Sequence, residues 1–222
     1  MKRLFPLLVL FGIAIILCAA FADGYKGTPW ESKPQTIPGK IECELYDNGG
    51  EGIAYHDMDS INNGSGRLNP ANGNYYNEFR MNEGVDISYT KTNSTDDNPF
   101  NDVNPKLNQL YVGWTSPGEW IKYTVDVKES CVYKIGIMYT SNGKGGIEII
   151  TENNKSTGLM HVLSTHKEID TVAWRQWHHW NKMDSIGSIE LEKGLQVITF
   201  KTCENGNMNY DYIEFVPVKS VK

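Results

Sequence analysis

Short segments of alternating apolar and polar residues are the feature that most restricts how this chain can fold. In Ile121–Val127 every second residue is apolar, and Cys131–Tyr139 and Ile189–Glu192 repeat this period of two. Turn-forming residues separate the segments: Asn48-Gly49-Gly50, Ser141-Asn142-Gly143, Lys193-Gly194 and Asn205-Gly206. No window has a convincing helical period. The pattern therefore predicts an all-β sandwich or barrel.

One face of these segments and of the last apolar segment is expected to form the core. On a strand, alternate side chains point to the same side of the sheet. The predicted core residues are Ile121, Tyr123, Val125, Ile135, Ile137, Ile213 and Phe215.

The N-terminus is typical of a secretory signal peptide covering residues 1–22. A basic start, Met1-Lys2-Arg3, precedes the apolar run Leu4–Leu17 and the small-residue cleavage pattern Ala20-Phe21-Ala22. An uncleaved anchor is the alternative, but the run is short for a membrane span. We therefore expect a secreted, extracellular protein with no membrane span after cleavage.

The remaining sequence divides into a lead-in, one module and a short tail. Residues 23–38 are polar and rich in proline and glycine, and are expected to be a linker. Residues 39–218 form the predicted module, and 219–222 a tail. The irregular stretch Lys91–Asn108 is long enough to be either a functional loop or a disordered one.

Charge and cysteine content exclude some classes of protein. The formal net charge is −6, and no basic patch points to a nucleic-acid partner. Cys43, Cys131 and Cys203 remain after signal cleavage, with spacings that match no zinc site. One disulfide with one free thiol, or three buried thiols, are both compatible with this count.

Three carboxylates suggest a site for a hard cation. Glu42 and Glu44 are two residues apart, so on a strand they share a face, where like charges repel unless a cation lies between them. Asp211 lies among apolar strand residues and is expected to point inward with Ile213 and Phe215. An oxygen-only set of this kind suits calcium, although two acids on a strand more often form a solvated face.

Tryptophans occur in segments that should be loops. Trp120 lies within a strand and is expected in the core, whereas Trp114 precedes the turn Thr115–Gly118. Trp174, Trp177 and Trp180 follow one another at spacings of three without a continuing helix. Exposed aromatic rings can stack on the apolar face of a pyranose, and packing beneath a loop is the alternative. His178 and His179 are adjacent and should point apart, which argues against a shared metal.

These pieces together resemble carbohydrate-binding module family 6, a family of secreted β-sandwich modules within the galactose-binding-like superfamily. The resemblance covers about Ile41–Val216, and its matching segments occur in the order of the family. They are Ile41-Glu42-Cys43-Glu44, Gly84–Ile87, Val112-Gly113-Trp114, Gly118-Glu119-Trp120, Trp174–Trp180, Lys193-Gly194 and Asn209–Ile213. The resemblance implies a jelly-roll sandwich of two antiparallel sheets.

The resemblance also implies two sites. A structural calcium would be held by Glu42, Glu44 and Asp211, with the backbone carbonyl of Arg80 as a further ligand. A sugar would lie in the loops at one end of the sandwich. The residues implied for the sugar site are Trp114 as one wall, Trp177 or Trp174 as the other, Asn209 as the amide, and His56 or Asp57 as the early polar residue.

Three functions are compatible with the sequence. The first is non-catalytic binding of a polysaccharide or oligosaccharide, such as a xylan, a β-glucan or a related plant or algal glycan, in association with a glycoside hydrolase. The second is a glycoside hydrolase on the same sandwich, which needs two facing carboxylates; Glu51, Asp57, Glu119 and Asp170 are available but unpaired by the sequence. The third is an adhesive or protein-binding domain. The resemblance favours the first.

Overall fold

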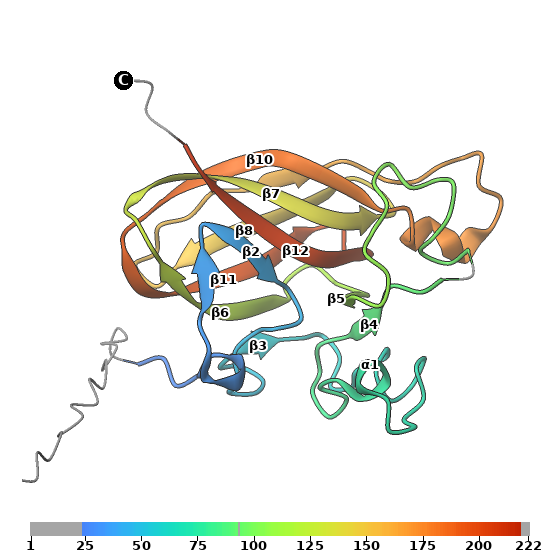
Figure 1. The fold of residues 1–222 in the computed structure, drawn as a ribbon, viewed down its shortest axis with the longest axis horizontal. Coiled ribbons are helices and arrows are strands. Elements are labelled where there is room, and N and C mark those ends of the chain that lie inside the picture. Colours follow the sequence, from blue (N-terminus) through green and yellow to red (C-terminus); the bar gives the residue numbers. More distant parts are fainter. Residues whose placement is uncertain (1–23, 93, 219–222) are drawn as a thin grey trace, which may run out of the picture.

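Two stacked β-sheets make up the protein, as predicted. The computed structural model describes residues 24–92 and 94–218. The first sheet has the strand order β1-β6-β11-β8-β9, with β3 also paired to β6 (Figure 1). Its strands are β1 (Gln35–Ile37), β3 (Tyr55–His56), β6 (Trp120–Val127), β8 (Gly145–Thr151), β9 (Met160–Val162) and β11 (Gly194–Glu204).

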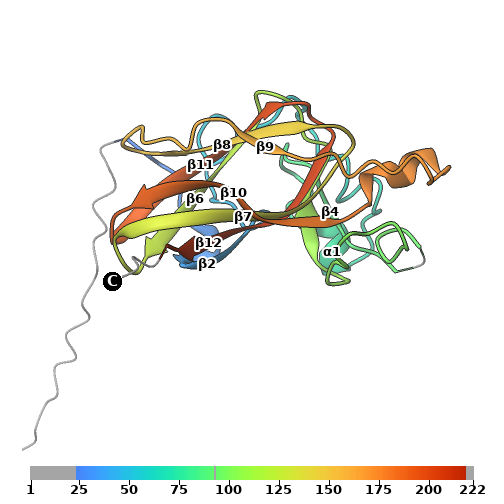
Figure 2. The same cartoon turned by 90° about the horizontal axis from the view of Figure 1, so that it is seen from above.

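The second sheet has the order β10-β7-β12-β5-β4, with β2 also paired to β12. Its strands are β2 (Gly39–Glu42), β4 (Ile87–Tyr89), β5 (Leu110–Val112), β7 (Cys131–Ser141), β10 (Asn181–Leu191) and β12 (Met208–Pro217). Strand pairs in both sheets are antiparallel, except that β1 runs parallel to β6. Figure 2 shows the sheets as two layers of a sandwich.

The core lies between the layers and matches the prediction at every position. All seven predicted core residues are buried, with relative exposures from 0% to 6%. The prediction for the tryptophans is partly wrong: Trp120 is only half-buried, whereas Trp180 is completely buried against Tyr111 and Met138. Cys43, Cys131 and Cys203 are free thiols.

A β-bulge in β12 changes the direction of Asp211. Tyr210 pairs with Tyr139 and Tyr212 pairs with Met138, so Asp211 is the extra residue between them. Tyr210 and Ile213 therefore both reach the core, while Tyr212 packs on the outer side of the sheet. The expectation that Asp211 points inward with Ile213 and Phe215 is wrong because a regular period of two does not hold across a bulge.

The lead-in is part of the fold, so its prediction as a linker is wrong. Strand β1 pairs with β6, and its Ile37 is completely buried in the core. The Tyr25 hydroxyl donates to Asp47 at 2.9 Å, and a short 3-10 helix, η1 (Trp30–Ser32), follows. The predicted signal peptide (1–22) and tail (219–222) lie outside the described residues. No helix in residues 24–92 and 94–218 is long and apolar enough to cross a membrane.

Irregular segments gather at one end of the sandwich. The short helices α1 (Tyr75–Glu78) and η2 (Ala173–Trp177) lie at this end, next to the long loop Lys91–Asn108 (Figures 1 and 2). Strands β5 and β12 also deliver Trp114 and Asn209 here, since both residues lie at or just beyond strand ends. The candidate site is built from these segments.

Candidate ligand cleft and neighbouring carboxylate sites

An open cleft of about 410 Å³ lies at the loop end. This volume falls within the range of about 300–1,000 Å³ that is typical of ligand pockets. Four of the predicted residues line it together: Trp114, Trp174, Trp177 and Asn209. Leu68, Tyr111, His178 and Asn207 complete its lining. Trp114 and Trp174 are 43% and 55% exposed, so large aromatic surfaces face solvent here.

Trp114 is held outward by a strained backbone. Its φ is 50°, the left-handed region that residues with a side chain rarely adopt and that costs on the order of 1–3 kcal/mol. Hydrogen bonds on both sides fix this conformation. Gly113 N donates to Asp86 O at 2.9 Å, and the Thr115 hydroxyl donates to Met208 O at 3.1 Å. Strain that is held in place at a cleft is typical of functional sites.

Helix η2 carries Trp174 and Trp177 on a rigid support. The buried side chain of Gln176 donates to Lys167 O and Asp170 O, each at 2.9 Å, and accepts from Lys167 N at 2.9 Å. Arg175 donates two hydrogen bonds of 2.7 Å to the Asp170 carboxylate. The guanidinium holds the pKa of Asp170 below its usual range. Asp170 thus has a structural role, which removes it from the acids available for catalysis.

Asn209 ties this support to strand β12. Its Nδ2 donates to Trp177 O at 2.6 Å, and the Thr140 hydroxyl donates to the same carbonyl at 2.9 Å. The contact with Trp177 O uses one N–H of this amide, so the second N–H and the side-chain oxygen of Asn209 are left for a ligand. Gly113 makes room for this oxygen, since a Cβ at that position would lie 2.7 Å from Asn209 Oδ1.

The long loop Lys91–Asn108 packs against the segment after η2. Its buried Asp96 accepts from Trp180 Nε1 at 2.7 Å and contacts His178 Nδ1 at 2.9 Å. Asn98 Nδ2 donates to His178 O at 2.9 Å. The described part of the loop is therefore ordered against the segment that carries His178, a residue of the cleft. His178 and His179 each pair with a different aspartate, so they share no metal.

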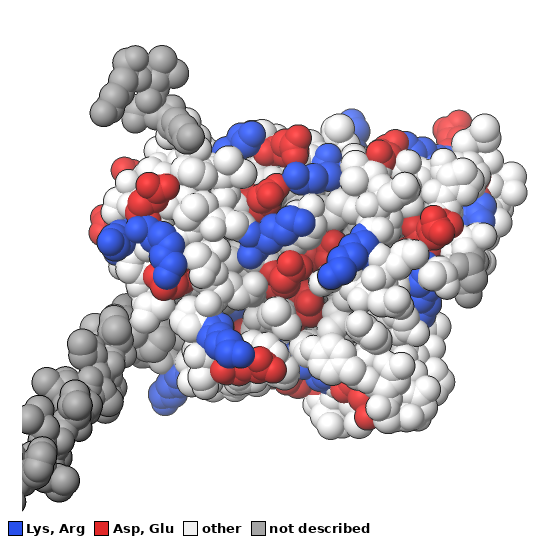
Figure 3. All heavy atoms as spheres, in the orientation of Figure 1, with Lys and Arg blue, Asp and Glu red and all other residues white. Residues whose placement is uncertain are grey.

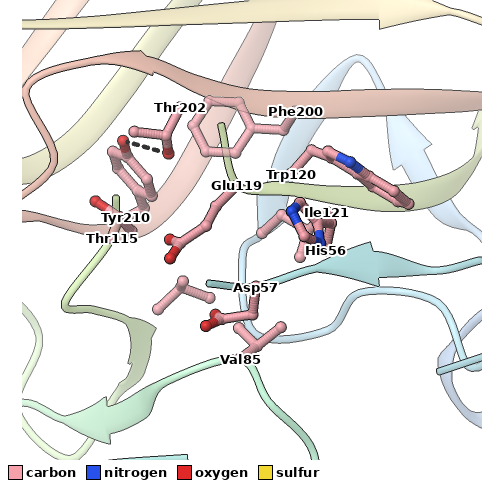
Figure 4. Close-up of a pocket in the computed structure, with 11 residues that line it drawn as sticks. His56, Asp57, Val85, Thr115, Glu119, Trp120, Ile121, Phe200, Thr202 and Tyr210 are labelled. Carbon is pink, nitrogen blue, oxygen red and sulfur yellow. Dashed lines mark hydrogen bonds between the residues drawn. The ribbon is translucent and has the colours of Figure 1, made fainter. Parts of the chain in front are cut away.

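His56 and Asp57 lie outside this cleft, contrary to the arrangement expected from the resemblance. Strand β3 pairs with β6 in the first sheet and sets His56 opposite Trp120. Both residues line a separate cavity of about 20 Å³, where the carboxylates of Asp57 and Glu119 point into the same space (Figure 4). The strand pairing, which sequence did not reveal, directs them there.

This small cavity has the paired acids of a hydrolase but not the space. Burial, together with the charges of Glu119, Asp86 and Asp59, raises the pKa of Asp57 to about 7. Burial also raises the pKa of Glu119. A raised pKa suits a general acid, yet about 20 Å³ holds little more than one water molecule. A sugar ring does not fit between these carboxylates.

The predicted calcium residues approach one another across β2 and β12. Strand β2 ends at Glu42, and a turn follows, so Glu44 does not share a strand face with Glu42 as expected. Cys43 N donates to Asp211 O at 2.9 Å, which joins this turn to the bulge. Burial and the charge of Glu42 raise the pKa of Glu44 and raise that of Asp211 to about 7. Ionisation of both carboxyl groups is therefore disfavoured in the folded chain.

Two unpaired oxygens test whether these residues suit a cation. Glu44 Oε2 and Asp211 Oδ1 are buried without a hydrogen-bond partner. Buried carboxylate oxygens without donors are costly unless a cation binds them, so these two oxygens suit a hard cation such as calcium. Within the described ranges, no three His, Cys, Asp or Glu side chains converge as metal ligands. Further ligands would therefore have to come from backbone carbonyls.

Arg80 has a prominent side-chain role besides its implied carbonyl. Its guanidinium is buried and donates to Tyr46 O at 2.7 Å and to Asp47 O at 2.9 Å. It also lies 3.4 Å from the Tyr46 ring centroid and 4.7 Å from that of Trp30. The carbonyl of Arg80 accepts from Glu83 N at 3.0 Å and keeps a second lone pair.

Lysines border the carboxylates on the outer side of the second sheet. Glu42 and Asp211 share a cavity of about 300 Å³ with Lys40 and Lys106. Burial raises the pKa of both acids, and the charges of the two lysines oppose this rise. Figure 3 shows acidic and basic side chains interspersed over this face of the molecule. A surface of mixed sign on this face does not resemble the continuous basic footprint that nucleic acid needs.

Sequence reasoning missed four residues of the cleft. Leu68 comes from the loop before α1, and Asn207 from the turn before β12. Tyr111 lies three residues before Trp114, and His178 directly follows Trp177, so both are close in sequence to residues that were predicted. An Asn-Gly-Asn turn next to Asn209 was the available signal for Asn207; Leu68 had none.

Comparison with known proteins supports the fold. No family model matches the sequence, and no curated protein matches it. A family 43 arabinoxylan arabinofuranohydrolase of Bacillus subtilis, solved in complex with cellotetraose, matches with a TM-score of 0.50 and 15% identity. The match covers 84% of this chain and 28% of that one, so the fold is shared with part of a longer enzyme.

Structures of family 6 carbohydrate-binding modules also match, with TM-scores under 0.5. One from Clostridium stercorarium in complex with cellobiose has a TM-score of 0.49 and 12% identity, over 84% of this chain and 98% of that one. A β-1,3-glucan-binding module from Bacillus halodurans has a TM-score of 0.47 and 18% identity, over 82% and 98%.

Proposed function

We propose that this chain is a secreted, non-catalytic glycan-binding module of the family 6 type. The observation that carries the proposal is the loop-end cleft, where Trp114, Trp174, Trp177 and Asn209 meet. Aromatic faces would stack on the apolar face of a pyranose while the amide oxygen of Asn209 binds a hydroxyl. The ligand would be a polysaccharide or oligosaccharide such as a β-glucan or xylan, and the partner a glycoside hydrolase.

A structural calcium is part of the proposal. Glu44 and Asp211 would bind the ion with the Arg80 carbonyl as a further ligand, and Glu42, which does not converge with them in this structure, is the third predicted acid. The support is the pair of unpaired buried oxygens on Glu44 and Asp211. When bound, the ion would neutralise repelling carboxylates and join the turn after β2 to the bulge of β12, away from the cleft.

Titration of tryptophan variants tests the cleft. An open site of this kind should bind with a dissociation constant on the order of 10–1,000 μM, or roughly 4–7 kcal/mol. Trp114→Ala and Trp177→Ala should each abolish detectable binding without unfolding the protein. Asn209→Ala should weaken it by about 1–3 kcal/mol, since a hydroxyl loses its partner and Trp177 loses its tie to β12.

The control is Trp120→Ala, which removes a half-buried tryptophan outside the cleft. A glycan array, followed by a reducing-sugar assay on each hit, supplies the ligand and tests the alternatives. Sugar release would favour a hydrolase, and no glycan hit would favour an adhesive domain. Loss of binding in Trp120→Ala but not in the cleft variants would show that the sugar binds on the sheet face and not in the cleft.

A further inference from the structure

His178 differs from its neighbour in a way that points to a ligand. The next residue, His179, is completely buried, and both its ring nitrogens have partners: Thr165 O at 3.1 Å and Asp170 Oδ2 at 2.8 Å. His178 lines the cleft, and only its Nδ1 has a partner, Asp96. In the described part of the chain, His178 Nε2 makes no hydrogen bond.

Asp96 fixes which ring nitrogen carries the proton. Its side chain is completely buried and accepts from Trp180 Nε1 and Lys91 N, each at 2.7 Å. A carboxylate that receives such donors is an acceptor, so His178 Nδ1 must donate to it. In the neutral imidazole the proton is then on Nδ1, and Nε2 offers a lone pair.

Asn209 offers a second acceptor in the cleft. It uses one N–H of Nδ2 on Trp177 O and keeps Oδ1 as well as its other N–H. None of the lining residues is a lysine or an arginine. A cleft that offers these two acceptors and is lined by no lysine or arginine favours a neutral ligand with hydroxyl protons to donate over a carboxylate.

We propose that His178 is a ligand-binding residue that accepts a hydrogen bond at Nε2 from a hydroxyl of a neutral glycan. Asp96 is the positioning residue that sets this polarity. The His178 ring also lies edge-on to Trp174, with centroids 5.9 Å apart at 74°, so it holds that aromatic wall in place. This inference rests on the proposed glycan-binding function and names a residue and a ligand class for the same cleft.

Long-range ¹H–¹⁵N spectra of the wild-type protein at pH 7.5 test the polarity directly. We expect the Nδ1–H tautomer of His178 in the free protein, and a change of the Nε2 shift when a binding probe is added. The probes are cellotetraose, laminarin and soluble arabinoxylan, with polygalacturonate as the anionic counterpart. An Nε2–H tautomer, or an Nε2 shift that stays constant while a probe binds, would overturn the proposal.

Variants separate this inference from the proposed function. His178→Phe keeps a ring against Trp174 and removes the acceptor, and should weaken binding about 3- to 10-fold, the loss of one hydrogen bond. His166→Phe is the matched control, because His166 is exposed and lies outside the cleft. Its affinity should equal that of the wild type.

The results of these experiments distinguish an error in the role of His178 from an error in the proposed function. If Trp114→Ala abolishes binding and His178→Phe does not weaken it, the proposed function stands and the role of His178 is wrong. If the wild type binds none of the neutral probes, the proposed function and this inference both fail. Tighter binding of polygalacturonate than of every neutral probe would overturn the ligand class.

Discussion

At the scale of single residues, the cleft depends on the absence of a side chain at Gly113. Gly113 directly precedes Trp114 and carries no side chain. A Cβ there would lie 2.7 Å from Asn209 Oδ1 and 3.1 Å from Tyr111 Cε2. Contacts this short would force the side chains of Asn209 and Tyr111 to move.

Gly113→Ala should therefore damage the cleft without changing any group that a ligand touches. We expect glycan affinity to fall, because displaced Asn209 loses its contact with Trp177 O. We expect the free energy of unfolding to fall by about 1–3 kcal/mol, which is typical of overpacking. Isothermal titration and urea unfolding measure the two effects. Ser116→Ala in the same loop is the control, and equal affinity in both variants would show that Gly113 has no such role.

Residue-level patterns explain why some site predictions hold and others do not. Trp114 was found from sequence because a turn follows it and marks the strand end, whereas Asn209 was implied only by the family resemblance. His56 and Asp57 were misplaced because the partner of β3 is set by tertiary pairing, which leaves no local signal. The side chain of Asp211 was misdirected because a bulge without glycine or proline interrupts the period of two.

At the scale of elements, local alternation predicts central strands well and peripheral ones poorly. Strands β6 and β7 have 8 and 11 residues, long enough for a period of two to be read. Strand β1 has 3 residues among prolines, so its pattern resembles a linker. Its membership in the sheet rests on pairing with β6, which only the folded chain displays.

Ile37→Ala tests whether β1 belongs to the folded unit. Ile37 is completely buried, so we expect a loss of about 2–5 kcal/mol in the free energy of unfolding, from lost apolar burial and the cavity left behind. Thr36→Ala, an exposed change in the same strand, should cost less than about 0.5 kcal/mol. Chemical denaturation gives both values. If both variants unfold like the wild type, the lead-in is a linker after all.

The long loop Lys91–Asn108 shows a different limit of sequence reasoning. Its polar composition suits either disorder or function, and composition cannot separate the two. The structure separates them through one buried acid, because Asp96 accepts from both Trp180 and the loop's own Lys91 N. A pairing between residues 84 positions apart has no local signature.

At the scale of the whole molecule, cleft and carboxylate site lie on different parts of one sandwich. The cleft occupies the loop end, whereas Glu42 and Asp211 line a separate cavity on the outer side of the second sheet. The calcium proposed there should thus affect stability more than ligand affinity. It should also make stability depend on pH in a defined direction.

The direction of this dependence of stability on pH follows from the raised pKa values of Asp211 and Glu44. Asp211 has a pKa of about 7 in the folded chain, against about 3.9 for an unperturbed aspartate, and the pKa of Glu44 is also raised. Their contribution to the stability of the metal-free protein is fully present below about pH 4. It is lost as the pH rises through about 7, because ionisation is easier in the unfolded chain. Calcium requires the ionised carboxylates, so its effect must grow over the same interval.

We therefore predict that calcium raises the melting temperature strongly at pH 8 and little at pH 5. At a calcium concentration 100 times the dissociation constant, the gain is about 2.7 kcal/mol, or roughly 5–10 °C for a chain of this size. Thermal unfolding with calcium or with excess chelator measures it, and glycan affinity at 20 °C should be the same in both. Asp211→Asn should remove the calcium effect and raise the stability of the metal-free protein at pH 8, because the repelling charge is gone. An equal melting temperature with and without calcium at pH 8, with metal removal verified, would exclude the ion from this site.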